Sequence, residues 1–532
     1  MNVDNTSDSK SLSREIGFLA LLFTGITGII GSGWLFASMY AAQIAGPAAI
    51  LSWFVGGFIA IILALVYAEL GGMIPVAGGI ARIPHFSHGT INSFMAGWLC
   101  WIAYVTTAPI EVTAVLEYSS NYFPWLTITQ HGERALSKEG VFVAGVLMLV
   151  FTVINMRGVK WLANANTTIT FWKLTIPVIA PILLIAVGFR LENFHAMGGF
   201  APNGTAGVLG AVSSGGVMFC LFGFRTAMDM AGEVKNPQRN VPLAMIGSLV
   251  ICLIIYIVLQ IAFIGVIPAD HLKDGWDKIS ESVPGGPFAA FATVLGMQWL
   301  AIALYGDAIL SPSGTGLAYT GATARINYAM SKNRQIPRIF EKLNRFKVPV
   351  WSLIFNFVAG MIIFLPFPGW SELVGFISSA VILSLAFGPV SLAALRYQVP
   401  DLKRPFRVPY GVVFSAISFA FVGFVVYWTG WETNWKVFLA ALMGLVILGI
   451  TRMTTKETND PLNLKESIWI WPYIFGLGLI SYLGSYGKGL GLLSEGLAMV
   501  IIAVFSLAIF VLALKLRLPD EQARSFVSKE EK

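Results

Sequence analysis

Two glycine-rich stretches lie inside long apolar segments, where they would interrupt a helix and free backbone groups for binding. The first is the run Gly28-Ile29-Ile30-Gly31-Ser32-Gly33. The second, in the segment 207–232, comprises Gly207, Gly210, Gly215, Gly216 and Gly223 and includes the run from Phe219 to Arg225, where the break is expected. Glycines in a membrane helix often serve only close packing against a neighbouring helix. Their recurrence in the first and the sixth apolar segment is instead typical of an inverted repeat, in which paired interruptions mark a binding site at mid-membrane depth.

The backbone groups freed by such interruptions predict what binds there. Unpaired N–H and C=O groups cost several kcal/mol each in lipid, so they must line a cavity or hold a ligand. The N–H groups after Gly31 carry the positive end of the helical segment that follows, which suits a carboxylate. Freed carbonyls at Ile29 and between Phe219 and Phe222 suit an ammonium group. Together these groups predict a receptor for the zwitterion of an α-amino acid.

Two cations, Lys173 and Arg225, also lie within the apolar segments. A charge inside a membrane costs at least about 2.5–3.5 kcal/mol on insertion scales, so each cation needs a partner or a role. Lys173 is deep in its segment, although a place near a helix end would let it reach the surface. Arg225 offers a bidentate partner to a carboxylate. Two interpretations of Arg225 stay open: a structural pair with Asp229 or Asp307, and a clamp for the side-chain carboxylate of an acidic substrate.

The elements that must position these residues are predicted to be membrane-spanning helices. Of the 532 residues, 56% are hydrophobic and 12% are charged, which is about half the charged share of a soluble domain. A bilayer core about 30 Å thick needs roughly 20 apolar residues as helix. Fourteen segments come close to this length: 16–44, 47–74, 90–122, 140–156, 165–188, 207–232, 243–267, 288–326, 350–366, 371–396, 410–429, 435–452, 467–486 and 494–516. The segment 350–366 is short, and the run Ser311-Pro312-Ser313-Gly314 is expected to interrupt 288–326. The predicted fold class is an all-α polytopic membrane protein.

The net charge of +7 is explained by membrane topology rather than by nucleic-acid binding. With a cytoplasmic N-terminus, 26 of the 35 Lys and Arg residues fall in inner segments and 7 in outer loops, and the other two are Lys173 and Arg225. An excess of Lys and Arg marks the cytoplasmic side of a membrane protein. The sequence therefore predicts a multi-pass protein of the cell (inner) membrane with both termini in the cytoplasm. Residues 1–15 and the tail 517–532 are expected to be disordered.

At this point the sequence resembles a known family, the amino acid–polyamine–organocation superfamily. The resemblance rests on the run 28–33, on Tyr67-Ala68-Glu69-Leu70 with Pro75 and Gly78-Gly79, and on the loop from Gly232 to Pro242 with its Lys-Asn-Pro-Gln-Arg motif. It extends over about residues 15–430. It implies a LeuT-like 5+5 inverted repeat with discontinuous helices 1 and 6. The first repeat would cover 16–188, the second 207–396, and accessory helices 11–14 would cover 410–516, with the role of helices 13 and 14 left open.

The resemblance also implies which residues form the site. Ser32 and Gly33 would hold the substrate carboxylate, and Ile29, Phe219 and Phe222 would hold its ammonium group. In proton-coupled members a lysine on the fifth helix takes the place of a sodium ion between helices 1, 5 and 8. A lysine removed from water gives up its proton more readily. The hypothesis is that Lys173 is the proton-coupling group, close to the hydroxyls of Ser311, Ser313 or Thr315.

The predicted function is secondary active transport by alternating access, as symport of an acidic amino acid with protons. Aspartate is the expected substrate, by resemblance to bacterial aspartate permeases of the superfamily. Two alternatives stay open: an exchanger of an amino acid against its decarboxylation product, and a permease for neutral amino acids. A membrane-embedded enzyme is a weaker alternative, since the sequence has no recognisable nucleophile–base set, metal-ligand cluster or cofactor fingerprint. A channel is a further alternative, against which saturable, stoichiometric flux would argue. No cofactor or metal is expected, and the partners are the amino acid, the proton and the lipid bilayer.

Overall fold

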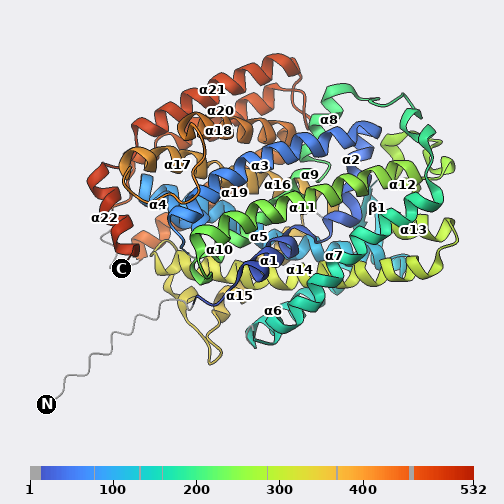
Figure 1. Ribbon diagram of the computed structural model, residues 1–532, viewed down its shortest axis with the longest axis horizontal. Helices are drawn as coiled ribbons and strands as arrows, with labels where there is room; N and C mark the ends of the chain where they lie inside the picture. The colour runs from blue at the N-terminus through green and yellow to red at the C-terminus, as the bar shows by residue number, and fades with distance from the viewer. Residues whose placement is uncertain are drawn as a thin grey trace.

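The computed structural model describes residues 14–531 except 77, 131–132, 158–159, 284–285, 367–368 and 455–460. The described chain is mostly helical, and its long helices run alongside one another through the molecule (Figure 1). One short hairpin pairs β1 (Thr127–Gln130) antiparallel with β2 (Glu133–Leu136). The disorder predicted for the N-terminus falls almost entirely outside the described residues.

Nine helices of the described chain are long and apolar enough to cross a membrane, or ten when the bent pair Gly204–Ser213 and Val217–Asp229 counts as one span. This confirms the class of an all-α polytopic protein but not the predicted number of fourteen spans. The segments 350–366 and 467–486 do form helices, α15 (Val350–Ile363) and α20 (Ile470–Leu483). Both are shorter than the roughly 20 residues that a complete span needs.

The first half of the chain supplies the helices that surround the first glycine run. They are α1 (Phe18–Ile29), α2 (Gly33–Ala45), α3 (Ala49–Met73), α4 (Gly79–His88), α5 (Thr90–Ser119), α6 (Lys138–Met156) and α7 (Lys160–Gly188). The apolar window of α5 is completely buried, and α14 (Gln298–Lys332) and α16 (Trp370–Leu385) pack along it. A helix that is apolar on every side is stable only when it is covered on every side, so α5 forms the centre of the bundle.

The second half supplies the helices around the other glycine run. They are α8 (Gly204–Ser213), α9 (Val217–Leu221), α10 (Arg225–Asp229), α11 (Pro237–Val266), α13 (Pro287–Val294), α14, α15, α16 and α17 (Phe387–Gln398). The prediction of an interruption at Ser311–Gly314 is wrong, because α14 continues through Pro312. The break lies at residues 295–297, where Gly296 has a φ of +76°. A left-handed glycine ends a helix, whereas a proline inside a packed membrane helix is tolerated.

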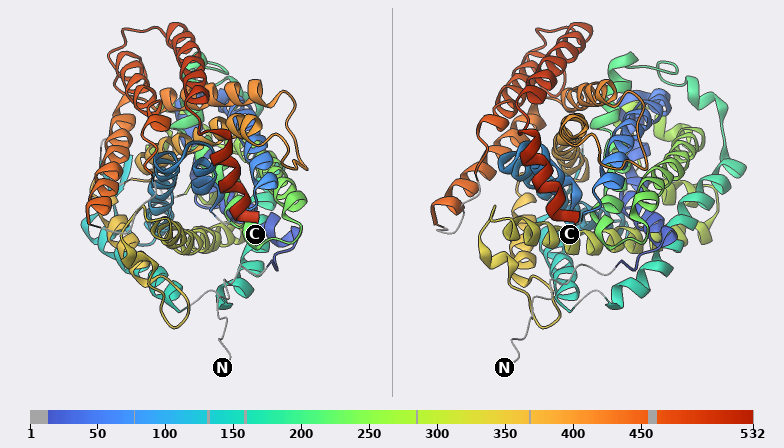
Figure 2. Two further views of the ribbon diagram at one scale, coloured as in Figure 1. Left: turned by 90° about the vertical axis from the view of Figure 1, so that its left-hand side faces the viewer. Right: turned by 60° about the vertical axis from the view of Figure 1, so that its left-hand side comes forward.

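The C-terminal helices cover one flank of the bundle. They are α18 (Gly411–Thr429), α19 (Trp431–Thr454), α20, α21 (Glu495–Lys515) and α22 (Asp520–Glu531), and α21 lies along α18 (Figure 1). The disorder expected for the tail is wrong: α22 lies across one end of the bundle and packs on α4 and α17 (Figure 2). Its Ala523 and Val527 are four residues apart, so they share one helix face, and both are buried.

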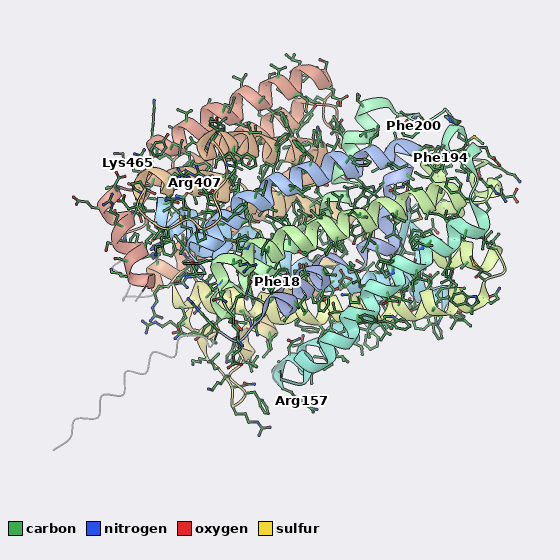
Figure 3. All side chains as sticks on the ribbon, in the orientation of Figure 1. Phe18, Arg157, Phe194, Phe200, Arg407 and Lys465 are labelled. Atoms are coloured by element: carbon green, nitrogen blue, oxygen red, sulfur yellow. The ribbon has the colours of Figure 1, made fainter. Side chains whose placement is uncertain are left out.

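The loops lie at the two ends of the bundle. Figure 3 places Arg407 and Lys465, from loops predicted to be cytoplasmic, at one end, and Phe194 and Phe200, from a loop predicted to be outside, at the other. Near Arg407, the buried Glu69 accepts hydrogen bonds from Arg396 Nη2 at 2.6 Å and from the Val408 amide at 2.7 Å. Glu69 and Arg396 therefore form a buried ion pair. The sidedness of the two ends stays a prediction.

Candidate functional site

Both predicted interruptions are present, although the second lies earlier in the chain than expected. α1 ends at Ile29 and α2 begins at Gly33, with an extended residue, Ile30, after α1. In the sixth segment α8 and α9 are separated by residues 214–216, Gly216 has a φ of +88°, and the helix axis bends by 42°. The run from Phe219 to Arg225, where the break was expected, is a short α-helix followed by a 3-10 turn.

The two interrupted segments touch at glycines. A Cβ on Gly28 would lie 2.9 Å from the carbonyl oxygen of Gly223, and a Cβ on Gly223 would collide with the carbonyl group of Gly28. Gly33 faces the Cys220 sulfur in the same way. Only glycine permits backbones to approach this closely, so these glycines join the two segments into one site.

The carbonyls freed at the first break are bound by side chains of neighbouring helices. The hydrogen bonds are Lys173 Nζ to Thr27 O (3.4 Å), Tyr319 OH to Gly28 O (3.5 Å), Tyr256 OH to Ile29 O (3.0 Å) and Thr315 Oγ1 to Ile30 O (3.3 Å). These donors come from α7, α11 and α14. The break is therefore held in place from three sides.

The amide freed at the start of α2 holds a carboxylate of the protein itself. The Ser32 amide donates to Glu111 Oε2 at 2.7 Å, and a Cβ on Gly31 would lie 2.5 Å from Glu111 Oε1. The Ser32 hydroxyl accepts a bond from Trp370 Nε1 at 3.0 Å. The subsite predicted for a substrate carboxylate is thus occupied by Glu111, an acid that is not among the predicted site residues. Its signal was an acid inside an apolar segment, which calls for a partner or a role.

A small cavity lies between the two interrupted segments and α5, α14 and α16. Its lining comprises Gly28, Ile29, Gly31, Thr107, Glu111, Phe219, Phe222, Gly223, Arg225, Thr315, Tyr319, Ile377 and Val381. Of the predicted substrate residues, the structure brings Ile29, Phe219, Phe222 and Arg225 together here. Ser32 and Gly33 lie behind the lining, with the Ser32 amide bound to Glu111.

Four aromatic rings pack together where α2, α9 and α16 meet near the cavity. Trp370 lies 5.2 Å from Phe36, 5.3 Å from Tyr40 and 6.0 Å from Phe219, measured between ring centres. Phe219 also lines the cavity.

Arg225 is buried in the cavity wall and has no carboxylate partner within the part of the chain that the structure describes. Its Nε donates to the Phe222 carbonyl at 3.1 Å, and its guanidinium carbon lies 4.9 Å from the centre of the Tyr104 ring. Among the described residues no acid lies within 4.0 Å of it, and Nη1 has no hydrogen-bond partner. Asp229 instead accepts a bond from the Tyr104 hydroxyl, and Asp307 accepts one from Trp34. The structural pair that one interpretation required is therefore not formed.

Lys173 occupies the junction of α1, α7 and α14. Its Nζ donates to Thr315 Oγ1 at 2.5 Å and to Thr27 O at 3.4 Å, and its side chain is completely buried. Thr315 is one of the three hydroxyls expected near it. Because Thr315 also lines the cavity, a single side chain separates the lysine from the candidate substrate space.

The sequence profile of the amino acid permeases matches residues 16–448, which contain every residue of this site. The chain belongs to the amino acid permease family. This permease is 40% identical over 515 residues to the glutamate/serine transporter AimA of Bacillus subtilis, covering 95% of the permease and 94% of that protein. It is 39% identical over 516 residues to an aspartate-proton symporter of the same organism, covering 96% and 98%. A methylthioribose transporter, also from Bacillus subtilis, is 29% identical over 434 residues, covering 77% and 87%.

The family settles the broad class of the protein. This permease is a multi-pass membrane transporter for amino acids and not an enzyme. Its substrate, its coupling and the roles of the residues described above are matters for proposal and test.

Proposed function

We propose that this permease is a secondary active transporter that carries an acidic amino acid, with aspartate as the first candidate, in symport with protons. The observation that carries the proposal is Arg225, a buried guanidinium with a free Nη1 on a cavity between two interrupted helices. A buried cation without a partner is costly, and an anionic ligand group would compensate it. The names of the two relatives near 40% identity, a glutamate/serine transporter and an aspartate-proton symporter, favour the same substrate class.

In this proposal the substrate extends from the first interruption to Arg225. Its α-carboxylate binds at the amide end of α2, at Ser32 and Gly33. Its ammonium group lies near the backbone of Ile29, Phe219 and Phe222. Its side-chain carboxylate reaches the guanidinium of Arg225, whose planar fork matches a carboxylate in two hydrogen bonds.

Glu111 competes with the substrate carboxylate for the Ser32 amide. Two carboxylates cannot both be ionised at the N-terminus of α2 without strong repulsion. A substrate carboxylate therefore enters when Glu111 withdraws or takes up a proton. This exchange makes substrate binding depend on protons at the site itself.

Lys173 is the proposed proton-coupling group. In its charged form it binds Thr27 O and Thr315 Oγ1 and ties α1 to α14. Loss of the proton weakens both bonds, since hydrogen bonds from an ionised donor are roughly twice as strong as neutral ones. The proton on Lys173 thus biases the position of α1, which is one end of the substrate site.

The same proposal includes the LeuT-like inverted repeat, with both termini in the cytoplasm. α1–α3 and α8–α11 form a bundle that rocks against α5, α6, α14 and α15, and the site is exposed to each side in turn. The paired interruptions and the contact between Gly28 and Gly223 support this arrangement.

Uptake of labelled amino acids into proteoliposomes, with and without an inward pH step, tests the proposal. We expect aspartate to accumulate only with the pH step, and acidic amino acids to compete best. Equal competition by neutral amino acids would refute the acidic substrate and favour the neutral permease, an alternative consistent with serine in the name of one relative. Uptake that requires an amino acid inside the vesicles and does not respond to the pH step would identify an exchanger.

A further inference from the structure

Three buried side-chain oxygens near the beginning and middle of α14 have no hydrogen-bond partner among the described residues. They are the Tyr118 hydroxyl, Asp307 Oδ1 and Ser311 Oγ. Leaving a buried polar atom unpaired costs about 1–3 kcal/mol, and almost all such atoms in native proteins are satisfied. Three of them in one region of the bundle point to a function that needs free polar atoms.

Two of these atoms belong to a row of polar side chains that leads to Lys173. The row consists of Asp307, Ser311 and Thr315, which follow one another at intervals of four residues and so share one face of α14. Thr315 Oγ1 accepts the 2.5 Å bond from Lys173 Nζ. The row from Asp307 to Thr315 covers eight residues, or about 12 Å along the helix at about 1.5 Å per residue.

The other end of the row leads to the surface. Tyr118, on α5, carries one of the three unpaired oxygens. The Tyr118 ring lies 6.1 Å from the ring of Tyr305, measured between centres, and Tyr305 is only half-buried. The Tyr305 hydroxyl accepts a hydrogen bond from the exposed Asn121 at 2.5 Å. Polar side chains thus follow one another from the end at which α14 begins towards the lysine, with a hydrogen bond at each end of the series, Asn121 to Tyr305 and Lys173 to Thr315.

Asp307 is the one acid of this row, and the groups around it do not pair its charge. From α2, Trp34 Nε1 donates to Oδ2 at 3.1 Å. From α7, Lys173 donates its hydrogen bonds to Thr315 Oγ1 and Thr27 O rather than to Asp307. Within the described chain no cation lies within 4.0 Å of Asp307. An unpaired carboxylate at full burial is unstable as a permanent anion, so it is suited to gain and lose a proton.

We propose that Asp307 is a second proton-carrying residue, which takes protons from the aqueous side at which α14 begins and passes them through Ser311 and Thr315 to Lys173. This inference rests on the proposed proton coupling of the permease. In the transfer the O–H bond of neutral Asp307 breaks, each hydroxyl accepts one proton and releases another, and an N–H bond forms on the neutral Lys173 amine. The products are the Asp307 carboxylate and the Lys173 ammonium, so the total charge is unchanged.

Trp34 links this transfer to the position of α2. Its indole N–H donates to Asp307, and a bond to an ionised acceptor is about twice as strong as one to a neutral acceptor. Release of the proton towards Lys173 therefore strengthens the contact between α2 and α14. Transfer of the proton from Asp307 to Lys173 would therefore hold α2 more firmly against α14.

The test compares wild type and Asp307→Asn in proteoliposomes, with labelled aspartate and an internal pH dye. We expect accumulation driven by the pH step, and the proton flux that accompanies aspartate, to fall at least tenfold in the variant. Counterflow of aspartate, which needs no net proton movement, should stay within twofold of wild type. Proton-driven accumulation at the wild-type level in Asp307→Asn would overturn the inference.

Two further measurements keep the result decisive. If Asp307→Asn lacks counterflow because it does not fold, the variant Ser311→Ala tests the relay instead. Proton-driven uptake should slow at least threefold in Ser311→Ala. It should not slow in Ser313→Ala, which removes a matched hydroxyl outside the row. Equal rates in these two variants would overturn the relay. If wild type itself ignores the pH step, the proposed proton coupling fails and this inference fails with it. If wild type responds to the pH step and Asp307→Asn responds equally well, the relay is refuted and the proposed proton coupling stands.

Discussion

Replacement of Arg225 by glutamine should change the preference of the permease for acidic substrates rather than its capacity to bind amino acids. Arg225 has a free Nη1 on the cavity and no acid within 4.0 Å in the described structure. A hydrogen bond to a charged group is worth about 1.5–3 kcal/mol, and about 1.4 kcal/mol corresponds to tenfold in affinity. Arg225→Gln should therefore weaken aspartate binding about 10- to 100-fold.

Serine is the matched ligand for this experiment, because it has the same α-amino acid group without the side-chain carboxylate. Its affinity should change less than threefold in Arg225→Gln. Arg225→Lys keeps the charge but loses the planar fork and the contact with the Tyr104 ring, so its aspartate affinity should fall between the other two proteins. The assay is inhibition of labelled-substrate counterflow by unlabelled aspartate or serine. Equal losses for both ligands would refute the assignment of Arg225 to the substrate side chain.

Three further predictions concern other parts of the site and its support. Lys173→Ala should abolish accumulation driven by a pH step in proteoliposomes while leaving counterflow measurable; proton-driven accumulation in this variant would contradict its coupling role. Gly223→Ala should prevent the close contact with Gly28 and remove both uptake and substrate-induced thermal stabilisation, whereas Gly449→Ala, at a position where a Cβ meets nothing, should keep both. Glu69→Ala should lower the melting temperature in detergent, since removing one partner of a buried ion pair costs about 3–5 kcal/mol; an unchanged melting temperature would show that Arg396 is satisfied without it.

The helix interruptions could be predicted from the sequence because glycine density is a local property. The position of the second one could not, because it depends on the positive φ of Gly216 rather than on the number of glycines. The continuity of α14 through Pro312 also escaped prediction, since it depends on the neighbours that surround the proline. Local composition thus indicates that a helix is broken, and packing decides at which residue.

The partners of the buried charges could not be predicted from the sequence, because they too depend on packing. Glu111 lies 79 residues from Ser32 in the sequence, yet its carboxylate binds the Ser32 amide. The two interpretations of Arg225 differed only in whether an acid lies within reach, and sequence distance says nothing about that: Asp229 is four residues away and is bonded to Tyr104. The residue types predicted the chemistry of the site, and only the three-dimensional contacts distinguish a free cation from a paired one.

The most direct test of the account is an experimental structure of the permease with aspartate bound. We predict that the ligand lies in the cavity between the two interrupted helices, with its side-chain carboxylate hydrogen-bonded to Arg225 and its α-carboxylate at the Ser32 amide in place of Glu111. Aspartate found outside this cavity, or bound with Glu111 still on the Ser32 amide and Arg225 untouched, would contradict it.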